Sequence, residues 1–245
     1  MKSYFIRNGA VVLHVLENGV LSERAPSILI INGLWESAER AMPLLSNIQG
    51  HVVTFSLRGR GLSSTPETNY NLEDHLSDIE AVISNCNLKN YCVLGFSRGA
   101  AYAIGWSLIH QQDMCGLILV DQTPIHRSVG KEALDFWSKL EYLQVPILNH
   151  MRLEALQGLA NDADEVDFSE QLSKLHIPVA LFVGRNAAAE IPSDISEETL
   201  KVYKESIPGL KVIEFQESGH MIPDEEQQKY IEEIDLFLKK LEITL

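Results

Sequence analysis

Short runs of aliphatic and β-branched residues recur along the chain, with room for a helix between most of them. The runs are nearly continuous in apolar residues rather than alternating, which is typical of strands covered on both faces, as in a parallel sheet. They lie at residues 11–16, 28–31, 52–55, 91–94, 117–120, 179–183 and 212–215.

Apolar residues repeat at helical spacing in segments between and after these runs. Alternating strands and helices imply β-α-β crossovers and an α/β sheet. We therefore predict an α/β fold with a mostly parallel central sheet flanked by helices, in a single domain over residues 1–245. The clearest repeats are Leu72, Leu76, Ile79 and Ile83, and Tyr230, Ile234, Phe237 and Leu241.

The segment 122–178 breaks this alternation, because it contains no convincing strand. Residues 132–142 and 149–159 have helical patterns, with Pro146 between them. We interpret 122–178 as a small helical cap over the C-terminal edge of the sheet. The alternative is a pair of ordinary packing helices.

Composition and charge argue against several classes of binding partner and site. The chain has 20 Lys and Arg against 34 Asp and Glu, a net charge of −14, which argues against a nucleic-acid or anionic-membrane surface. Its 3 cysteines have no pairing pattern typical of a disulfide framework or a zinc site. The N-terminus has no signal-peptide pattern and no apolar run approaches a membrane span, so we expect a cytoplasmic location.

The most specific motif is Gly95-Phe96-Ser97-Arg98-Gly99, which follows one predicted strand and precedes the helical run 100–109. G-x-S-x-G between strand and helix is typical of a nucleophile elbow, where a serine stands exposed on a tight turn. Side chains at the two glycine positions would collide with the adjoining strand and helix. We predict that Ser97 is a nucleophile; a simple strand–helix turn is the alternative.

A candidate base follows the last predicted strand, in Ser218-Gly219-His220. A serine hydroxyl is a poor nucleophile without a base within hydrogen-bond reach. His220 lies just past a strand end, where sites form in open α/β sheets, and comes after the serine in the chain. We predict that His220 is this base.

The segment Asn32-Gly33-Leu34-Trp35 follows the strand at 28–31. A backbone N–H here can pair with that of Arg98 to form an oxyanion hole. The alternative is an ordinary turn.

These pieces, together with Arg58-Gly59-Arg60-Gly61-Leu62-Ser63, resemble the α/β-hydrolase superfamily, in the branch of small esterases, haloperoxidase-like enzymes and C–C hydrolases. The resemblance implies the α/β-hydrolase fold, with Ser97 as nucleophile and His220 as base. It also implies that Leu34 and Arg98 donate the oxyanion-hole N–H groups.

The chain departs from the pattern of this superfamily at three positions. Asn32 replaces the usual His before Gly, and Ser56 replaces the usual Asp that opens the Arg-Gly-x-Gly-x-Ser segment. We expect both to alter local support rather than chemistry. Ala187 occupies the position of the Asp that usually orients the catalytic His, within the run Ala187-Ala188-Ala189.

The missing acid leaves three alternatives. Asp121 directly follows the strand at 117–120, at the same sheet edge as Ser97, and is our candidate for the acid that orients His220. Glu190, three residues past Ala187, is a second candidate. The third is that the chain has no native acid, or that one was removed from position 187.

The predicted function is that of a serine hydrolase acting on a small ester or similar acyl compound, with no cofactor or metal. We expect Trp35 and Trp137 to contact the substrate. Cap residues that could line an apolar acyl pocket are Phe136, Trp137, Leu143, Met151 and Leu156. The rivals are a non-hydrolytic ligand-binding or regulatory protein on the same fold, and a C–C hydrolase or lyase. The oligomeric state is left open.

Overall fold

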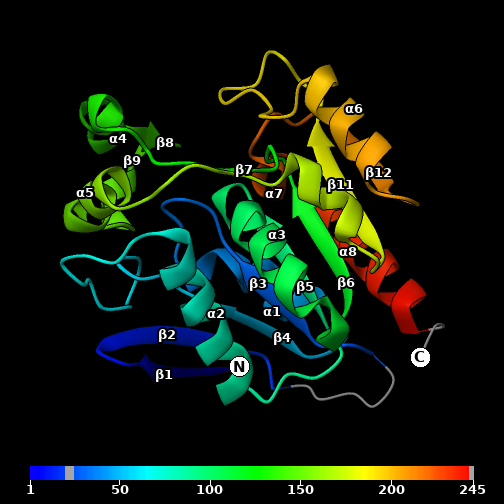
Figure 1. The fold of residues 1–245 in the computed structure, drawn as a ribbon, viewed down its shortest axis with the longest axis horizontal. Helices are drawn as coiled ribbons and strands as arrows, with labels where there is room; N and C mark the ends of the chain where they lie inside the picture. Colours follow the sequence, from blue (N-terminus) through cyan, green and yellow to red (C-terminus); the bar gives the residue numbers. More distant parts are fainter. Residues whose placement is uncertain (20–24, 243–245) are drawn as a thin grey trace.

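The computed structural model describes residues 1–19 and 25–242. Its centre is an eight-stranded sheet with the order β1-β2-β4-β3-β5-β6-β11-β12 (Figure 1). The strands are β1 (Lys2–Asn8), β2 (Val11–Glu17), β3 (Ile28–Ile31), β4 (Val52–Phe55), β5 (Tyr91–Phe96), β6 (Met114–Val120), β11 (Val179–Gly184) and β12 (Lys211–Phe215).

The sheet is mostly parallel, as the apolar runs predict. Only β2 pairs antiparallel with its two neighbours, β1 and β4; the other adjacent strands are parallel. All residues of β3, β4, β5 and β11 are buried, which explains their continuous apolar sequences. The apolar runs do not predict β1. Most of its residues are exposed, so its sequence has no continuous apolar run.

Helices cover both faces of the sheet. Successive strand residues point to opposite faces, so Leu29 and Ile31 pack in one core cluster and Ile28 and Ile30 in the other. The first cluster includes residues of α2 (Leu72–Asn85), α3 (Arg98–His110) and α6 (Glu197–Ser206). The second includes residues of α1 (Met42–Asn47), α7 (Ile222–Glu225) and α8 (Gln227–Glu242).

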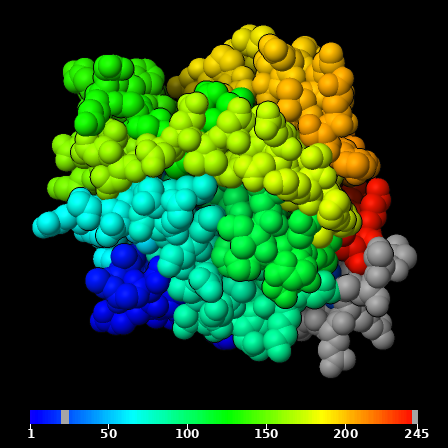
Figure 2. Space-filling model, viewed as in Figure 1, coloured from blue at the N-terminus to red at the C-terminus, as the bar shows by residue number. Residues whose placement is uncertain are grey.

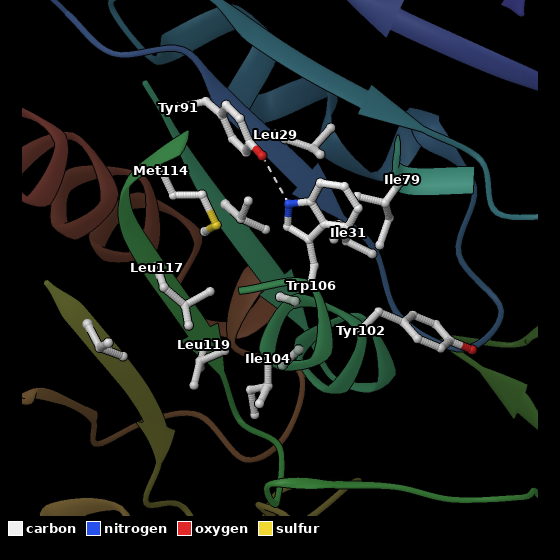
Figure 3. Packing of buried hydrophobic residues seen from close by; sticks show 14 of the residues in the cluster. Leu29, Ile31, Ile79, Tyr91, Tyr102, Ile104, Trp106, Met114, Leu117 and Leu119 are labelled. Atoms are coloured by element: carbon white, nitrogen blue, oxygen red, sulfur yellow. Dashed lines mark hydrogen bonds between the residues drawn. The ribbon is translucent and has the colours of Figure 1, made fainter. Parts of the chain in front are cut away.

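The packing around α3 shows how the first cluster holds this helix against the sheet (Figure 3). Trp106 of α3 lies beside strand residues Leu29 and Ile31, and its indole N–H donates to the hydroxyl of Tyr91 at 3.0 Å. This packing fixes the helix that begins directly after Ser97.

The segment 122–178 contains short elements of both kinds. Its helices are α4 (Leu134–Lys139) and α5 (Leu153–Asn161), with 3₁₀ turns at Lys131–Ala133, Ile147–Asn149 and Ser169–Lys174. The expectation that it holds no strand is wrong in detail, because β7 (Ile125–His126) pairs with β10 (Val166–Asp167), and β8 (Glu141–Tyr142) with β9 (Val145–Pro146). Further 3₁₀ turns lie at Ala38–Ala41 and Gln111–Asp113.

In Figure 1, α4, α5 and the β8–β9 hairpin lie on the side toward which the arrowheads of β6 and β11 point. In the space-filling view of Figure 2, the yellow-green part of this segment runs across the molecule above α2 and α3. Within the described residues, no helix combines the length and apolar character needed to cross a membrane.

Candidate active site

Ser97 occupies the turn between β5 and α3. Its backbone has φ +52° and ψ −130°, a conformation that costs energy for a residue with a side chain. A Cβ atom at Gly95 would collide with the Gly99 carbonyl, and one at Gly99 with the carbonyls of Ile31 and Asn32. The two glycines of the motif are therefore required by close approach of the backbone, as the sequence predicts.

His220 lies on the loop between β12 and α7 and reaches Ser97. Its Nε2 is 2.8 Å from the Ser97 Oγ. The backbone of the loop is fixed by the His220 N–H, which donates to the carbonyl of Ile191 at 2.8 Å. The Phe96 ring lies 5.4 Å from the imidazole, centroid to centroid. Two residues 123 positions apart in the chain are thus within hydrogen-bond distance.

Asp121 follows β6 and contacts the other nitrogen of His220. Its Oδ2 is 2.8 Å from Nδ1, and its side chain is 0% exposed. Oδ1 also accepts from the Gly184 N–H and the Ser193 hydroxyl, and Oδ2 from the Asp194 N–H. A buried carboxylate needs such donors, because burial without them is costly.

The contacts of His220 define its tautomer. A carboxylate only accepts hydrogen bonds, so Nδ1 carries the hydrogen and donates to Asp121. Nε2 is then free to accept from the Ser97 hydroxyl. This arrangement suits proton transfer from the serine to Nε2.

The other acid candidates have no such contact in the described structure. Ala187 is exposed, and the Asn186 side chain donates to the Glu217 carbonyl at 3.1 Å instead of to the imidazole. Glu190 lines the pocket described below but forms no hydrogen bond or ion pair with His220.

The backbone N–H groups of Leu34 and Arg98 have no hydrogen-bond acceptor among the described residues. Within the described residues, neither donates a hydrogen bond to another group of the chain, and Arg98 is the first residue of α3, where an N–H has no helical partner. The Gly33 N–H, by contrast, donates to the Glu36 carboxylate at 2.8 Å. Both N–H groups are therefore left without an acceptor in the described chain, and Leu34 and Arg98 line the same pocket as Ser97.

Two buried charged side chains that sequence reasoning missed support this loop. Arg60 is 0% exposed, and its Nε donates to the Leu34 carbonyl at 2.9 Å. Glu36 lies 2.7 Å from the Nε of Arg40, whose Nη2 donates to Asp224 of α7 at 2.7 Å. Burial raises the pKa of Glu36, and the positive charge of Arg40 opposes this shift.

The substituted family positions have structural roles. The Asn32 side chain is buried and donates to the Ser37 carbonyl and the Thr54 hydroxyl, both at 3.1 Å. The Ser56 hydroxyl accepts from the Ala38 N–H at 2.8 Å. Both residues hold the turn after β3, in line with the expectation of local support.

A pocket of about 540 Å³ opens over Ser97 and His220. Its apolar wall comes from Trp35 and from cap residues, and the Trp35 and Trp137 rings lie 6.3 Å apart. Its lining is Leu34, Trp35, Ser97, Arg98, Gln122, Arg127, Ser128, Val129, Phe136, Trp137, Leu140, Glu141, Glu190, Ile191, Pro192, Asp194 and His220.

Three residues expected in the acyl pocket lie elsewhere. Met151 and Leu156 are 1% and 0% exposed and pack in a third core cluster. Leu156 lies on α5, whose apolar face turns to that cluster, and Met151 lies just before the helix, bridged to Arg60. Leu143 lines a neighbouring cavity of about 320 Å³. Phe136 and Trp137 remain in the pocket wall.

Possible metal ligands and cysteines lie as follows in the described part of the chain. No group of three or more His, Cys, Asp and Glu side chains there is arranged to hold a metal ion. The 3 cysteines, Cys86, Cys92 and Cys115, are unpaired, and none lines the pocket.

Comparison with known proteins gives relatives of one fold. The chain is 28% identical over 194 residues to N-formylmaleamate deformylase of Pseudomonas putida, covering 68% of this chain and 70% of that protein. It is 26% identical over 129 residues to 2-(acetamidomethylene)succinate hydrolase of Mesorhizobium japonicum, covering 52% of this chain and 45% of that protein. An esterase from Exiguobacterium antarcticum has a similar structure, with a TM-score of 0.76 and 18% identity, covering 94% of this chain and 96% of that one.

The family itself is shown by a sequence model described as alpha/beta hydrolase fold, which matches residues 26–175. This range includes the segment 32–35 after β3, the motif from Gly95 to Gly99, and Asp121. The chain belongs to the α/β-hydrolase family.

Proposed function

We propose that the protein is a serine hydrolase that cleaves a small ester or similar acyl compound through an acyl-enzyme on Ser97. The observation that carries this proposal is the unbroken hydrogen-bond chain from Ser97 to His220 to Asp121, with both distances 2.8 Å. Nucleophile, base and acid in this order are the components of acyl transfer by a Ser-His-Asp triad.

The site residues divide the proposed reaction among them. The Ser97 oxygen attacks the substrate carbonyl carbon while His220 Nε2 takes the hydroxyl proton. The amides of Leu34 and Arg98 bind the oxyanion of the tetrahedral intermediate. Collapse breaks the bond to the leaving group, which receives the proton from His220. Water then attacks the acyl-enzyme with His220 again as base, releasing the acid and restoring Ser97.

Asp121 stabilises the imidazolium and holds His220 in the productive tautomer. The rival interpretation as a non-hydrolytic binding protein rested on the absence of an acid at position 187. The Asp121–His220 hydrogen bond offers an acid from another strand, which supports hydrolysis as the proposed function.

We further propose that the segment 122–178 acts as a cap in a single domain, with Trp137 and Trp35 contacting the acyl group. The lining of the pocket by cap residues supports this role. A small molecule in the cytoplasm is the substrate we expect. The two relatives named above are an N-formylmaleamate deformylase and a 2-(acetamidomethylene)succinate hydrolase. Their names support the proposal that amides as well as esters be tested as substrates.

A fluorophosphonate probe tests the proposal. We expect the wild-type protein to gain one covalent label at Ser97, and Ser97→Ala to lose both labelling and turnover, on the order of 10⁶-fold in kcat. Ser173→Ala, at an exposed serine on a 3₁₀ turn, is the matched control and should label like wild type. Labelling of Ser97→Ala at the wild-type rate, or no labelling of wild type, would overturn the proposal.

A further inference from the structure

The Arg98 side chain is held in place by neutral groups. Its Nε donates to the Tyr102 hydroxyl at 2.8 Å, and its Nη2 is 3.3 Å from Nε2 of His126. Nδ1 of His126 lies 2.9 Å from the Asp164 carbonyl, which only accepts, so this nitrogen carries the hydrogen and Nε2 accepts from Arg98. The guanidinium is therefore oriented by a phenol and a neutral imidazole.

Both acceptors are buried, and His126 is a neutral imidazole near neutral pH. Tyr102 and His126 are 0% and 1% exposed. Burial, assisted by the positive charge of Arg98, lowers the pKa of His126 to about 4. Neither group compensates the charge of Arg98.

No carboxylate of the described residues compensates it either. Arg58 forms an ion pair of 2.7 Å with Asp78, and Arg127 one of 3.7 Å with Glu165, but Arg98 forms none. The nearby Arg60 is fully buried and also lacks an acid partner. Burial lowers the pKa of Arg60 to about 10, and the charge of Arg98 contributes to this shift.

This uncompensated charge lies beside the proposed nucleophile. Arg98 directly follows Ser97, and both line the same pocket. Glu141, Glu190 and Asp194 also line the pocket, but none is at ion-pair distance from Arg98, and the Asp194 carboxylate accepts from the Thr123 N–H. With Nε bonded to Tyr102 and one Nη2 hydrogen to His126, both hydrogens of Nη1 and one of Nη2 are left for a ligand.

We propose that the Arg98 guanidinium binds a carboxylate of the substrate, so that the enzyme acts on acyl compounds carrying an anionic group close to the scissile carbonyl. A carboxylate fits the Nη1–Nη2 edge in the paired geometry that arginine favours. Tyr102 and His126 are positioning residues that fix the guanidinium through Nε and Nη2. This inference rests on the serine-hydrolase function proposed above, and it restricts the substrates to acyl compounds with an anionic group.

A matched ester pair tests the inference. The two compounds are mono-4-nitrophenyl succinate and its methyl ester, which share one acyl chain and leaving group but differ in charge; spontaneous hydrolysis is subtracted. We expect wild-type kcat/KM to favour the acid, and the ratio to fall as NaCl rises from about 20 mM to about 500 mM, because salt screens the attraction.

Arg98→Gln keeps the backbone amide and removes the charge. We expect it to lower the acid-to-methyl-ester ratio of kcat/KM about ten- to hundredfold, the size of a charge-assisted interaction, mainly through KM for the acid. Tyr102→Phe should lower the same ratio less. Arg7→Gln, at an exposed residue of β1, changes the net charge equally and should leave the ratio at the wild-type value.

The outcomes separate this inference from the proposed function. A wild-type enzyme that cleaves the methyl ester as well as or better than the acid, with a ratio insensitive to salt, overturns carboxylate binding but leaves serine hydrolysis standing. An unchanged acid-to-methyl-ester ratio of kcat/KM in folded Arg98→Gln also overturns carboxylate binding and leaves serine hydrolysis standing. Failure of wild type to cleave either ester or to label at Ser97 refutes the hydrolase itself. The wild-type salt series keeps the test decisive if Arg98→Gln does not fold.

Discussion

Two loops leave neighbouring parallel strands at the same sheet edge, and they differ in what they bring to His220. The loop after β6 begins with Asp121, which adopts φ +46° and turns a fully buried carboxylate to the imidazole. The loop after β11 has Ala187, exposed, at the position where a resemblance to the α/β hydrolases places the acid. Because β6 and β11 are adjacent, with Val120 paired to Phe182, an acid after either strand starts from nearly the same place.

The end of β11 and the loop after it donate hydrogen bonds to Asp121. The Gly184 N–H, at the end of β11, and the Ser193 hydroxyl both donate to Oδ1 of Asp121, and the Asp194 N–H donates to Oδ2. The segment that carries the acid in the family pattern here supplies donors that stabilise an acid on the next strand. The comparison teaches that the sheet edge, not one strand, determines where a carboxylate can reach the histidine.

The largest expected effect separates the two loops directly. Asp121→Asn keeps the shape of the side chain but removes the charge and disturbs the tautomer of His220. We expect kcat to fall on the order of 10⁴-fold with KM little changed. The measurement is steady-state hydrolysis of a chromogenic ester, with thermal unfolding to show that the variant folds.

The matched control is Asp113→Asn, an exposed residue next to the opposite end of β6. It makes the same chemical change without contact to His220 and should keep wild-type kcat. Full activity in Asp121→Asn would show that another residue is the acid, and would contradict the assignment of this role to the loop after β6.

A smaller effect measures what the β11 loop contributes. Ser193→Ala removes one donor, at 2.6 Å, from the buried carboxylate while leaving the imidazole contact in place. Since a hydrogen bond to a charged group contributes about 1.5–3 kcal/mol, we expect kcat to fall about ten- to hundredfold, with KM unchanged. An unchanged kcat, measured with the same ester, would mean that the loop only fills space beside Asp121.

The smallest effect is expected at position 187. Ala187 is exposed and its loop is occupied in supporting Asp121, so Ala187→Asp should change kcat/KM no more than about twofold, within the range of ordinary surface substitutions. The Asp121→Asn/Ala187→Asp double variant should remain near the Asp121→Asn value. A sharp rise in activity in either variant would show that the acid belongs at position 187 and that this chain is an impaired form.

Much of the fold follows from the sequence, because strands covered on both faces need continuous apolar runs. The elbow glycines were equally predictable, since G-x-S-x-G describes a local backbone constraint. The sequence does not predict β1, because this strand lies at the sheet edge and only Ile6 among its residues is buried. Met151 and Leu156 were misassigned because an apolar helix face does not say whether it turns to a pocket or to a core.

The sequence favours Asp121 as the acid but leaves Glu190 and the absence of an acid as alternatives, because the choice depends on which strands are adjacent. Strand order places β11 next to β6 although 58 residues, including the segment 122–178, separate Val120 from Val179. The partners of Arg60 and Glu36 were hidden for the same reason: Arg60 bonds to Leu34, 26 residues away, and Glu36 is linked through Arg40 to Asp224. Long-range polar contacts leave no periodic pattern in the chain.

The central claim is that Asp121 holds the Nδ1 hydrogen of His220, and proton NMR of the imidazole tests it most directly. Wild type should show one far-downfield exchangeable resonance, assigned to this hydrogen by its absence in His220→Ala. The resonance should vanish or move upfield in Asp121→Asn and stay in place in Ala187→Asp. A resonance that persists unchanged in folded Asp121→Asn would show that another group holds the hydrogen, and would contradict the assignment of Asp121.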